Sequence, residues 1–431
     1  ARDYIGTNLR TNAFIEQEVT YGVLSGDLFD LPGGTIKAAM GFEARVEQGD
    51  YNASAIQNLA LTRSVARPSL GGGYEVDADY YEVSVPLLGE DLTLPGVMSL
   101  VADYSARTID NTIAGSYDVD AISLNWRIMD DLAVRISEQT AVKAPDLGDL
   151  FLPQITAFSR ADDPCDYRFR DVGRNPEQRR ANCDAEGIPA DFVSLVVNAT
   201  ARGVTGGNPN LINEVADTKS TGLVYQPSWW GDVLFGAASF AVDYIEIELT
   251  DYVTSYSLTQ NMNACYDYDT YPNSQFCDSF SRDAEFQVDD FATGLINAGL
   301  IDFATYVWKA DWAFDVSELA SFVSRENVAM DLGSMAIRYR ATQEDFFASA
   351  DSGAAEDLRS ATGQFGNDEW FYDTQFEWAY QDWYVYVQGN SRSGGVIDID
   401  RVYDDEYLGY DGQPIFEFDG AGEMVAPAND E

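Results

Sequence analysis

The sequence predicts an all-β protein, an antiparallel transmembrane β-barrel with long extracellular loops. Three observations support this fold class: apolar and polar residues alternate with a period of two, short turns alternate with long polar stretches, and aromatic residues gather near predicted strand ends. With 45% hydrophobic and 13% aromatic residues, the 431-residue chain is too apolar to be disordered. It has no run of 18 or more apolar residues that would predict a membrane-spanning helix.

The alternation is clearest over residues 36–46. Here apolar side chains occupy every second position, whereas Lys37, Glu43 and Arg45 lie on the opposite face of the predicted strand. Pointing a charged side chain into lipid costs roughly 2–4 kcal/mol. The charged face therefore predicts a watery interior, and the apolar face predicts contact with lipid tails. A soluble β-domain also alternates and is the alternative, because it would leave the charged face as ordinary surface.

The turn lengths also favour a barrel over a sandwich. Hairpins with short turns are predicted over residues 122–136, from 221 to beyond 233, and over 376–387. Long polar stretches cover residues 153–210 and 261–290, and these are predicted to be extracellular loops. A globular sandwich more often keeps both sets of connections short.

Aromatic side chains near the predicted strand ends resemble the girdles that membrane barrels place at the bilayer interface. The girdle residues are Trp126, Trp312, Trp378, Trp383, Tyr225 and Tyr380.

Apart from a weak amphipathic turn at Val316 to Arg325, no helix is predicted, and the acidic segment from Asp398 to Glu431 is predicted to be a loop.

The charge balance excludes several functions. The chain has 26 Lys and Arg against 72 Asp and Glu, a net charge of −46, and no histidine. Nucleic-acid binding needs clustered basic residues, and Ser-His-Asp catalysis, His-ligated zinc and haem ligation by histidine are impossible. No carboxylate cluster has the spacing of a calcium loop, so we predict no metal site and no cofactor. So many carboxylates would also repel anionic lipid headgroups unless divalent cations or salt intervene.

Four cysteines form two close pairs in polar stretches, Cys165 with Cys183 and Cys265 with Cys277. Neither pair has the spacing of a metal knuckle. Three pairings are possible, and free thiols are a further alternative. We favour two local disulfides, because each would close one loop upon itself, which places these loops in an oxidising compartment.

Five strings resemble motifs of the TonB-dependent receptors, in the order of that family. The segment 135–153, RISEQTAVKAPDLGDLFLP, is similar to its "AVRAPN…ELF.P" signature, and 163–165 matches its DPC element. Residues 207–218 resemble "GNPNL.PE.AD", residues 240–251 resemble "F..DYY.IEI.D", and residues 85–97 resemble the "VPLL…LPGV" hairpin. The resemblance covers about Gly26 to Val387.

This resemblance implies an outer-membrane receptor of a Gram-negative bacterium. Such receptors import nutrients too large for porins, and the inner-membrane TonB complex supplies the energy through a plug inside the barrel. Residues 1–431 would be one barrel region without the plug, with about fourteen of the family's roughly 22 strands. We expect residues before and after this sequence to complete the barrel, because unpaired backbone groups are not tolerated in lipid.

The expected function is energised uptake of a small nutrient, of the siderophore or oligosaccharide class, without catalysis. Expected partners are the TonB complex, outer-membrane lipid and lipopolysaccharide. The alternatives are a secreted β-rich glycoside hydrolase that uses an Asp/Glu pair, and a passive porin. Candidate ligand contacts, by stacking or hydrogen bonding, are the loop residues Tyr167, Arg168, Arg170, Tyr266, Tyr268 and Tyr271.

Overall fold

A computed structural model gives the fold of this chain. It describes residues 6–59, 61, 66–89, 91–173, 175–326, 330–350, 358–364 and 366–395, together with 417–418 and 424–425. The segment from Asp398, predicted to be a loop, therefore lies outside the described residues, except for the two-residue strands β17 (Glu417–Phe418) and β18 (Met424–Val425). None of the helices among the described residues is long and apolar enough to cross a bilayer.

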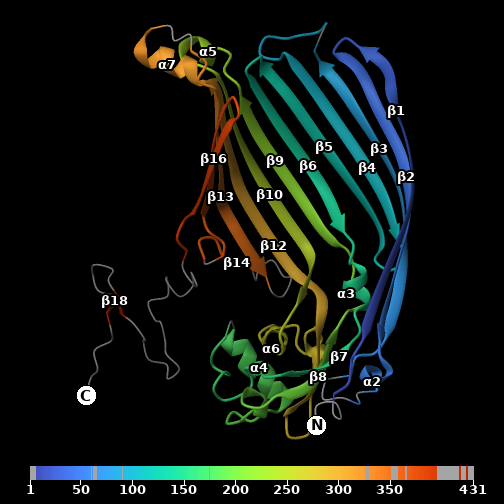
Figure 1. Ribbon diagram of the computed structural model, residues 1–431. Coiled ribbons are helices and arrows are strands. Elements are labelled where there is room, and N and C mark those ends of the chain that lie inside the picture. Colours follow the sequence, from blue (N-terminus) through green and yellow to red (C-terminus); the bar gives the residue numbers. More distant parts are fainter. Residues whose placement is uncertain are drawn as a thin grey trace.

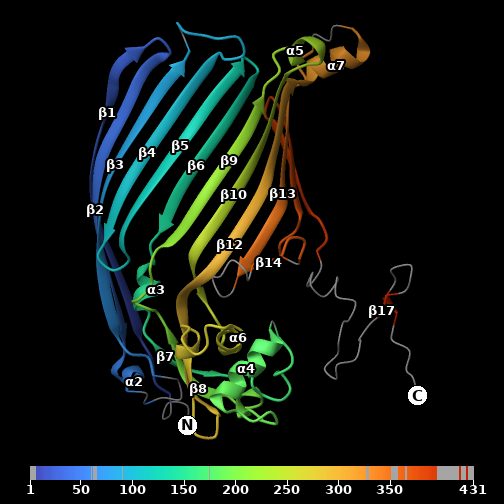
Figure 2. The same cartoon turned by 180° about the vertical axis from the view of Figure 1, so that it is seen from behind.

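The protein is dominated by one curved, 16-stranded sheet, which forms the wall of a partial barrel (Figures 1 and 2). Twelve long strands follow one another around the wall, and four short strands lie off this path. The wall strands are β1 (Thr11–Leu31), β2 (Gly34–Ala53), β3 (Leu70–Leu88), β4 (Ser99–Asn111), β5 (Gly115–Met129), β6 (Leu132–Lys143), β9 (Glu214–Tyr225), β10 (Ala237–Ser255), β12 (Val288–Asp315), β13 (Ser334–Ala350), β15 (Trp370–Tyr380) and β16 (Trp383–Arg392). The short strands are β7 (Ile155–Ser159), β8 (Ala201–Gly206), β11 (Phe280–Arg282) and β14 (Arg359–Ser360).

Every neighbouring pair of wall strands is antiparallel, and strands adjacent in the wall follow one another along the chain. All three predicted hairpins are confirmed. β5 pairs with β6 through the two residues after Met129, and β15 pairs with β16 through Gln381 and Asp382. In the third hairpin, β9 pairs with β10 across a longer turn that contains the helix α5 (Trp230–Val233). Connections alternate between the two ends of the wall (Figure 1). One end carries the tight turns after β1, β5 and β15, and also the longer connection that contains α7 (Val316–Ser324). The other end carries the longest connections, from β6 to β9 and from β10 to β12, and one short turn between β4 and β5.

One hydrophobic cluster identifies the concave face of the wall. It joins Tyr74 on β3 and Ile109 on β4 with Val253 on β10 and Leu295 on β12. The strands β5, β6 and β9 lie between β4 and β10 in the sheet. Side chains from β4 and β10 can therefore meet only on the inside of the curve. Because neighbouring side chains on a strand point to opposite faces, this cluster fixes which residues line the interior.

The interior face carries charges that pair with one another. Arg45, which pairs with Val76 in the strand register, lies 3.2 Å from Glu47, and Arg107 donates a 3.0 Å hydrogen bond to Glu43. Glu43 and Arg45 are among the charges that the sequence predicts to face a watery interior. Farther around the same interior face, the guanidinium of Arg135 on β6 donates hydrogen bonds to both carboxylate oxygens of Asp243 on β10, each at 2.6 Å.

Between this last pair, Gly222 on β9 leaves the space that the two side chains occupy. A Cβ atom at Gly222 would lie 2.1 Å from Oδ1 of Asp243 and 2.8 Å from Nε of Arg135. Lys309 on β12 approaches the same carboxylate at 3.8 Å. These interior charges are thus paired with one another across three or four strands.

The opposite, convex face exposes large apolar side chains. A soluble protein would bury such a surface, whereas a membrane barrel turns it toward lipid. Exposed residues on this face include Leu24, Met40, Phe42, Tyr81, Tyr104, Ile122, Ile136, Leu223 and Trp308.

The residues of the predicted aromatic girdle lie near strand ends, all at the end of the wall that carries the tight turns after β1, β5 and β15. The indole N–H groups of Trp126, Trp312 and Trp378 each donate a 3.0 Å hydrogen bond to a backbone carbonyl, those of Gly96, Phe235 and Leu332 respectively. A tryptophan side chain at a bilayer interface has an apolar ring and a polar N–H group that needs a hydrogen-bond acceptor. These backbone carbonyls supply that acceptor.

Toward the end with the long connections, the same convex face becomes acidic. Glu75, Asp77 and Asp79 on β3 are exposed on it, as are Asp110 on β4 and Asp118 on β5. A strand needs only about 9–11 residues to cross a bilayer, whereas β1, β2 and β3 have 21, 20 and 19 residues. The long strands therefore carry the wall, and its carboxylates, well beyond the apolar band.

The structure contains more helices than the sequence predicts. The amphipathic turn predicted at Val316 to Arg325 is confirmed as α7 (Val316–Ser324). Helix α4 (Pro176–Glu186) was not predicted, although Asn175 caps it, a proline opens it and Gly187 ends it in the left-handed conformation. Its composition is strongly polar, so it lacks the apolar stripe by which a helix is usually found. The described residues also contain the short helices α2 (Ala55–Asn58), α3 (Leu147–Phe151) and α6 (Leu258–Tyr266).

The two faces of β5 give a matched mutational test. Ile122→Arg places a charge on the convex face, and we expect it to lower the free energy of unfolding in a bilayer by about 2–4 kcal/mol. Ser123→Arg, one residue along, enters the interior beside Asp103, which already accepts a hydrogen bond from Ser123. We expect this control to change stability by less than about 1 kcal/mol. Denaturant titration in lipid vesicles checks both values, and equal losses would mean that the convex face does not contact lipid.

Candidate ligand-binding lobe

The end of the wall with the long connections carries a compact unit, which we call the disulfide lobe, residues 155–206 and 256–294. It contains β7, β8, α4, α6, β11, the first part of β12 and two 3₁₀ helices, Leu195–Val197 and Cys277–Ser279 (Figure 1). The sequence predicts two long extracellular loops here, residues 153–210 and 261–290, each closed by a disulfide. The structure shows instead that both segments fold together around a shared core.

Strand β12 joins the lobe to the wall. With 28 residues it is the longest strand among the described residues. Its later part, from Leu295 on, pairs with β10 and from Leu300 also with β13. Its earlier residues pair with β8 in parallel at Ala292 to Gly294 and with β11 at Val288 to Phe291. A single continuous strand thus carries the wall's hydrogen-bond ladder into the lobe, which fixes the lobe's position.

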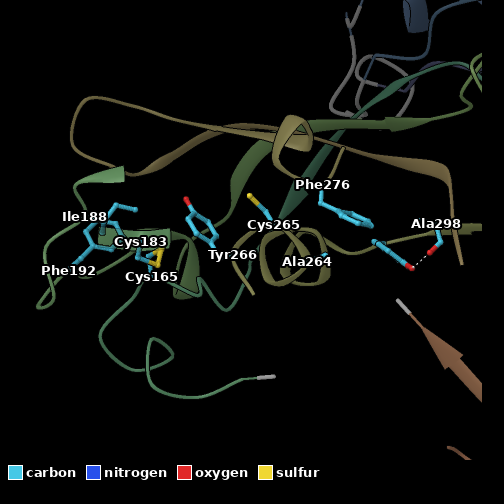
Figure 3. Packing of buried hydrophobic residues seen from close by; sticks show 10 residues of the cluster. Cys165, Cys183, Ile188, Phe192, Ala264, Cys265, Tyr266, Phe276 and Ala298 are labelled. Atoms are coloured by element: carbon cyan, nitrogen blue, oxygen red, sulfur yellow. Dashed lines mark hydrogen bonds between the residues drawn. A yellow bond between two sulfur atoms is a disulfide. The ribbon is translucent and has the colours of Figure 1, made fainter. Parts of the chain in front are cut away.

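Two disulfides close the lobe, as the sequence predicts. Cys165 pairs with Cys183 and Cys265 with Cys277, with Cα–Cα distances of 5.7 and 4.9 Å. Figure 3 shows the first disulfide beside Ile188 and Phe192, with Tyr266 and Phe276 further along the same core. The disulfides thus form part of one apolar cluster, drawn from both segments of the lobe.

Buried ion pairs hold the two segments to each other. The guanidinium of Arg282 donates two 2.8 Å hydrogen bonds to the carboxylate of Asp163, whose side chain is fully buried. Arg179 on α4 bonds both oxygens of Asp267 at 2.5 and 2.6 Å, and both of these side chains are 4% exposed. Removing one partner of such a pair leaves a buried charge unpaired, which costs far more than the pair itself gains.

Glu186 at the end of α4 bridges to the second disulfide loop. Its carboxylate accepts hydrogen bonds from the hydroxyls of Tyr266 and Tyr271. Burial, and then the negative charge of Glu186, raise the pKa of Tyr271 to about 12. The pKa of Tyr266 is raised further, chiefly by burial. Both hydroxyls therefore stay protonated and donate to Glu186 at any ordinary pH.

The six predicted ligand residues fall into three groups by exposure. Arg170 and Tyr266 are buried, at 5% and 1% exposure. Arg170 bonds Asp184 and the carbonyl of Ile188, so in this conformation both residues serve the interior of the lobe. Tyr167 is 55% exposed and lies beside the guanidinium of Arg168.

The other three predicted ligand residues are half-buried. They are Arg168, Tyr268 and Tyr271. Arg168 bonds the carboxylate of Asp166 at 2.7 and 2.8 Å, and the backbone carbonyl of Tyr268 accepts a 2.8 Å hydrogen bond from Asn182. Contact between any of the six residues and a ligand remains a prediction.

Sequence reasoning missed the residues that hold the lobe together. Asp163 and Arg282 are 119 positions apart, and Arg179 and Asp267 are 88 apart, so no local spacing connects them. The one available signal was that these arginines stand in a chain with few basic residues. In such a chain an arginine within a long polar stretch is a candidate for a structural ion pair.

The fold and the lobe together define a receptor-type β-barrel. The sequence profile described as "TonB dependent receptor-like, beta-barrel" matches residues 2–311, so the chain belongs to this family. Members of the family are outer-membrane transport receptors of Gram-negative bacteria. The sequence matches no functionally curated protein.

Solved structures agree with this fold. The siderophore receptor PirA of Acinetobacter baumannii superposes with a TM-score of 0.51 at 10% identity, over 93% of this chain and 45% of that one. A point mutant of the ferric enterobactin receptor PfeA of Pseudomonas aeruginosa, in complex with enterobactin, superposes with a TM-score of 0.52 at 12% identity, over 96% of this chain and 46% of that one. The chain thus spans a little under half the length of these receptors.

The buried pair of Arg282 and Asp163 gives a test of how the lobe is held. We expect Arg282→Met to destabilise the lobe by about 3–5 kcal/mol, because it leaves the Asp163 carboxylate buried without its partner. Arg180, which pairs with Asp171 where the side chains are 42% and 70% exposed, is the matched control. Arg180→Met should cost less than about 1 kcal/mol. Proteolysis rates of the lobe check both values, and similar rates for the two variants would contradict this account.

Asp166 gives a pH-dependent test. Burial alone would raise its pKa, but the Arg168 side chain and the backbone N–H groups of Arg168 and Ser194 lower it below its ordinary value of 3.8. Its contribution to stability is therefore fully present above pH 3.8 and is lost as the pH falls through the lowered value. We expect Asp166→Asn to flatten this acid-side loss, measured by proteolysis or tyrosine fluorescence between pH 2 and 6. An unchanged profile would contradict the assignment.

Proposed function

We propose that this chain is the barrel portion of an outer-membrane receptor that binds a scarce nutrient outside the cell. The TonB complex would then drive the nutrient inward. The observation that carries the proposal is the division of the wall into a convex face of exposed apolar residues and a concave face of paired charges. This arrangement suits a wall between lipid and water, and no soluble enzyme needs it.

The orientation of the wall follows from its connections. Barrels of this type have short periplasmic turns and longer extracellular loops. The disulfide lobe therefore belongs outside the cell, where an oxidising environment maintains its two disulfides. Its exposed and half-buried residues Tyr167, Arg168, Tyr268 and Tyr271 are then available for ligand contact at the mouth of the barrel.

The energy source and the ligand class come from the family and from its relatives. Members of the family use the TonB complex through a plug inside the barrel. The structural relatives PirA and PfeA are siderophore and ferric enterobactin receptors, which favours a ferric siderophore over an oligosaccharide. The paired interior charges, such as Arg135 with Asp243, give a polar surface for a plug to contact.

Uptake by whole cells tests the proposal. A strain that lacks this gene should fail to grow on one or more ferric siderophores as the only iron source, while growth on ferric citrate or on simple sugars is unchanged. Radiolabelled siderophore should bind wild-type cells with or without a protonophore, but enter them only without it, because energised transport needs the proton gradient. Entry that continues in the presence of the protonophore would identify a passive pore instead.

A further inference from the structure

A surface of exposed apolar side chains lies beside the wall, at the end that carries the tight turns. There α7 forms part of the connection from β12 to β13, and α5 forms part of the connection from β9 to β10. Both views of the fold show the two helices next to each other, projecting sideways on the side away from β1 (Figures 1 and 2). At the same end β5 and β6 are joined by only two residues, so closing a hairpin does not require a helix.

Helix α7 packs on aromatic rings that continue the convex face of the wall. The ring centroid of Phe322 lies 5.4 Å from that of Phe235, which follows α5. Phe235 in turn lies 4.8 Å from Trp312 and 4.9 Å from Phe314, again between ring centroids. Trp312 and Phe314 alternate in step with the exposed Trp308 on β12, so they belong to the convex face. The helix is therefore attached to the apolar side of the wall and not to its charged interior.

The helix has one apolar and one polar face. Winding the sequence at 3.6 residues per turn gathers the apolar side chains on one side and the polar side chains on the other. The apolar side chains are those of Val316, Leu319, Ala320, Phe322 and Val323, and the polar ones are those of Ser317, Glu318, Ser321 and Ser324. Phe322 is 50% exposed and Val323 is 73% exposed. Packing on the wall thus leaves much of the apolar face of α7 uncovered.

The polar groups of α7 suit a site at the edge of a bilayer. The hydroxyl of Ser321 donates a 2.8 Å hydrogen bond to the carbonyl of Ser317, and that of Ser324 donates one of 2.7 Å to the carbonyl of Ala320. A hydroxyl bonded in this way to its own helix has less need of water. The charged residues of the helix and its ends are mainly acidic, so attraction to anionic lipid does not hold it in place. These residues are Asp315, Glu318, Arg325 and Glu326.

We infer that α7 is an interfacial helix that lies in the headgroup region of the lipid leaflet beside it, with Phe322 and Val323 dipping toward the acyl chains. Amphipathic helices with an exposed aromatic side chain bind membranes in this orientation, parallel to the surface. The depth fits, because the neighbouring Trp312 donates its indole N–H to the carbonyl of Phe235 at the level of the aromatic girdle. The acidic ends of the helix favour zwitterionic phospholipid as the partner.

The anchor would also hold β12 at a fixed depth. This strand ends at Asp315, directly before α7, and its other end pairs with β8 and β11 in the disulfide lobe. The inference goes beyond the proposed function and rests on it in one respect. Only if the lobe is extracellular is the leaflet that receives α7 the periplasmic one.

Fluorescent labels on the protein in phosphatidylcholine vesicles test the inference. The four native cysteines are paired in disulfides, so a thiol-reactive, environment-sensitive fluorophore labels only an introduced cysteine. Val323→Cys places the label on the apolar face, and Glu318→Cys is an exposed control on the polar face. We expect the label at residue 323 to emit at shorter wavelength and to lose fluorescence when the acyl chains are brominated near the headgroup. The label at residue 318 should keep its wavelength and its intensity.

Equal responses at residues 318 and 323, or a label at 323 that reports water, would overturn the inference. In the second case the apolar face would have to bind another protein instead. Replacing part of the phosphatidylcholine by phosphatidylglycerol should leave the quenching at 323 unchanged, and quenching that appears only with this anionic lipid would also contradict the inference. Circular dichroism and heat-dependent gel mobility show whether each variant is folded.

A label at Ile122→Cys separates this inference from the proposed function. Ile122 lies on the convex face of β5, so bromine in the acyl chains should quench its label if the wall crosses the bilayer. Quenching at residue 122 without quenching at residue 323 refutes the interfacial helix alone. Absence of quenching at residue 122 refutes the membrane wall, and with it the proposed receptor.

Discussion

A β-sheet in a bilayer must pair its backbone groups within the protein and turn only apolar side chains toward lipid. Both requirements shape this wall. Neighbouring strands are paired in register over most of their lengths, and exposed residues such as Met40, Ile122 and Trp308 alternate with interior residues such as Glu43 and Arg45. The interior charges are tolerated because they neutralise one another, most fully where Gly222 leaves room for Arg135 and Asp243 to meet.

The same strands account for the acidity of the protein. Because β1 to β3 are about twice as long as a bilayer requires, their far ends leave the lipid, and carboxylates such as Asp77 and Asp79 can be exposed there at little cost. The longest strand, β12, goes further still and becomes part of the disulfide lobe. The wall and the lobe therefore share one continuous strand.

The fold could be predicted from the sequence because alternation and turn length are local properties. The β5–β6 hairpin, the aromatic girdle and the two disulfides all follow from residues close to one another in the chain. The interior of the lobe could not be predicted in this way. Asp163 meets Arg282 only because the sheet curves and β12 returns. Helix α4 was missed for a different reason, since its polar sequence has no apolar stripe to reveal it.

The most direct measurement of the central claim uses spin labels placed in turn at Ile122, Ser123, Leu124 and Asn125 in vesicles. Molecular oxygen concentrates in lipid and a nickel chelate in water, so the two relaxation agents report which medium each label faces. We expect labels at Ile122 and Leu124 to be relaxed mainly by oxygen, and labels at Ser123 and Asn125 mainly by the chelate. Four labels with the same response, or the reverse alternation, would show that the apolar face of this wall does not contact lipid.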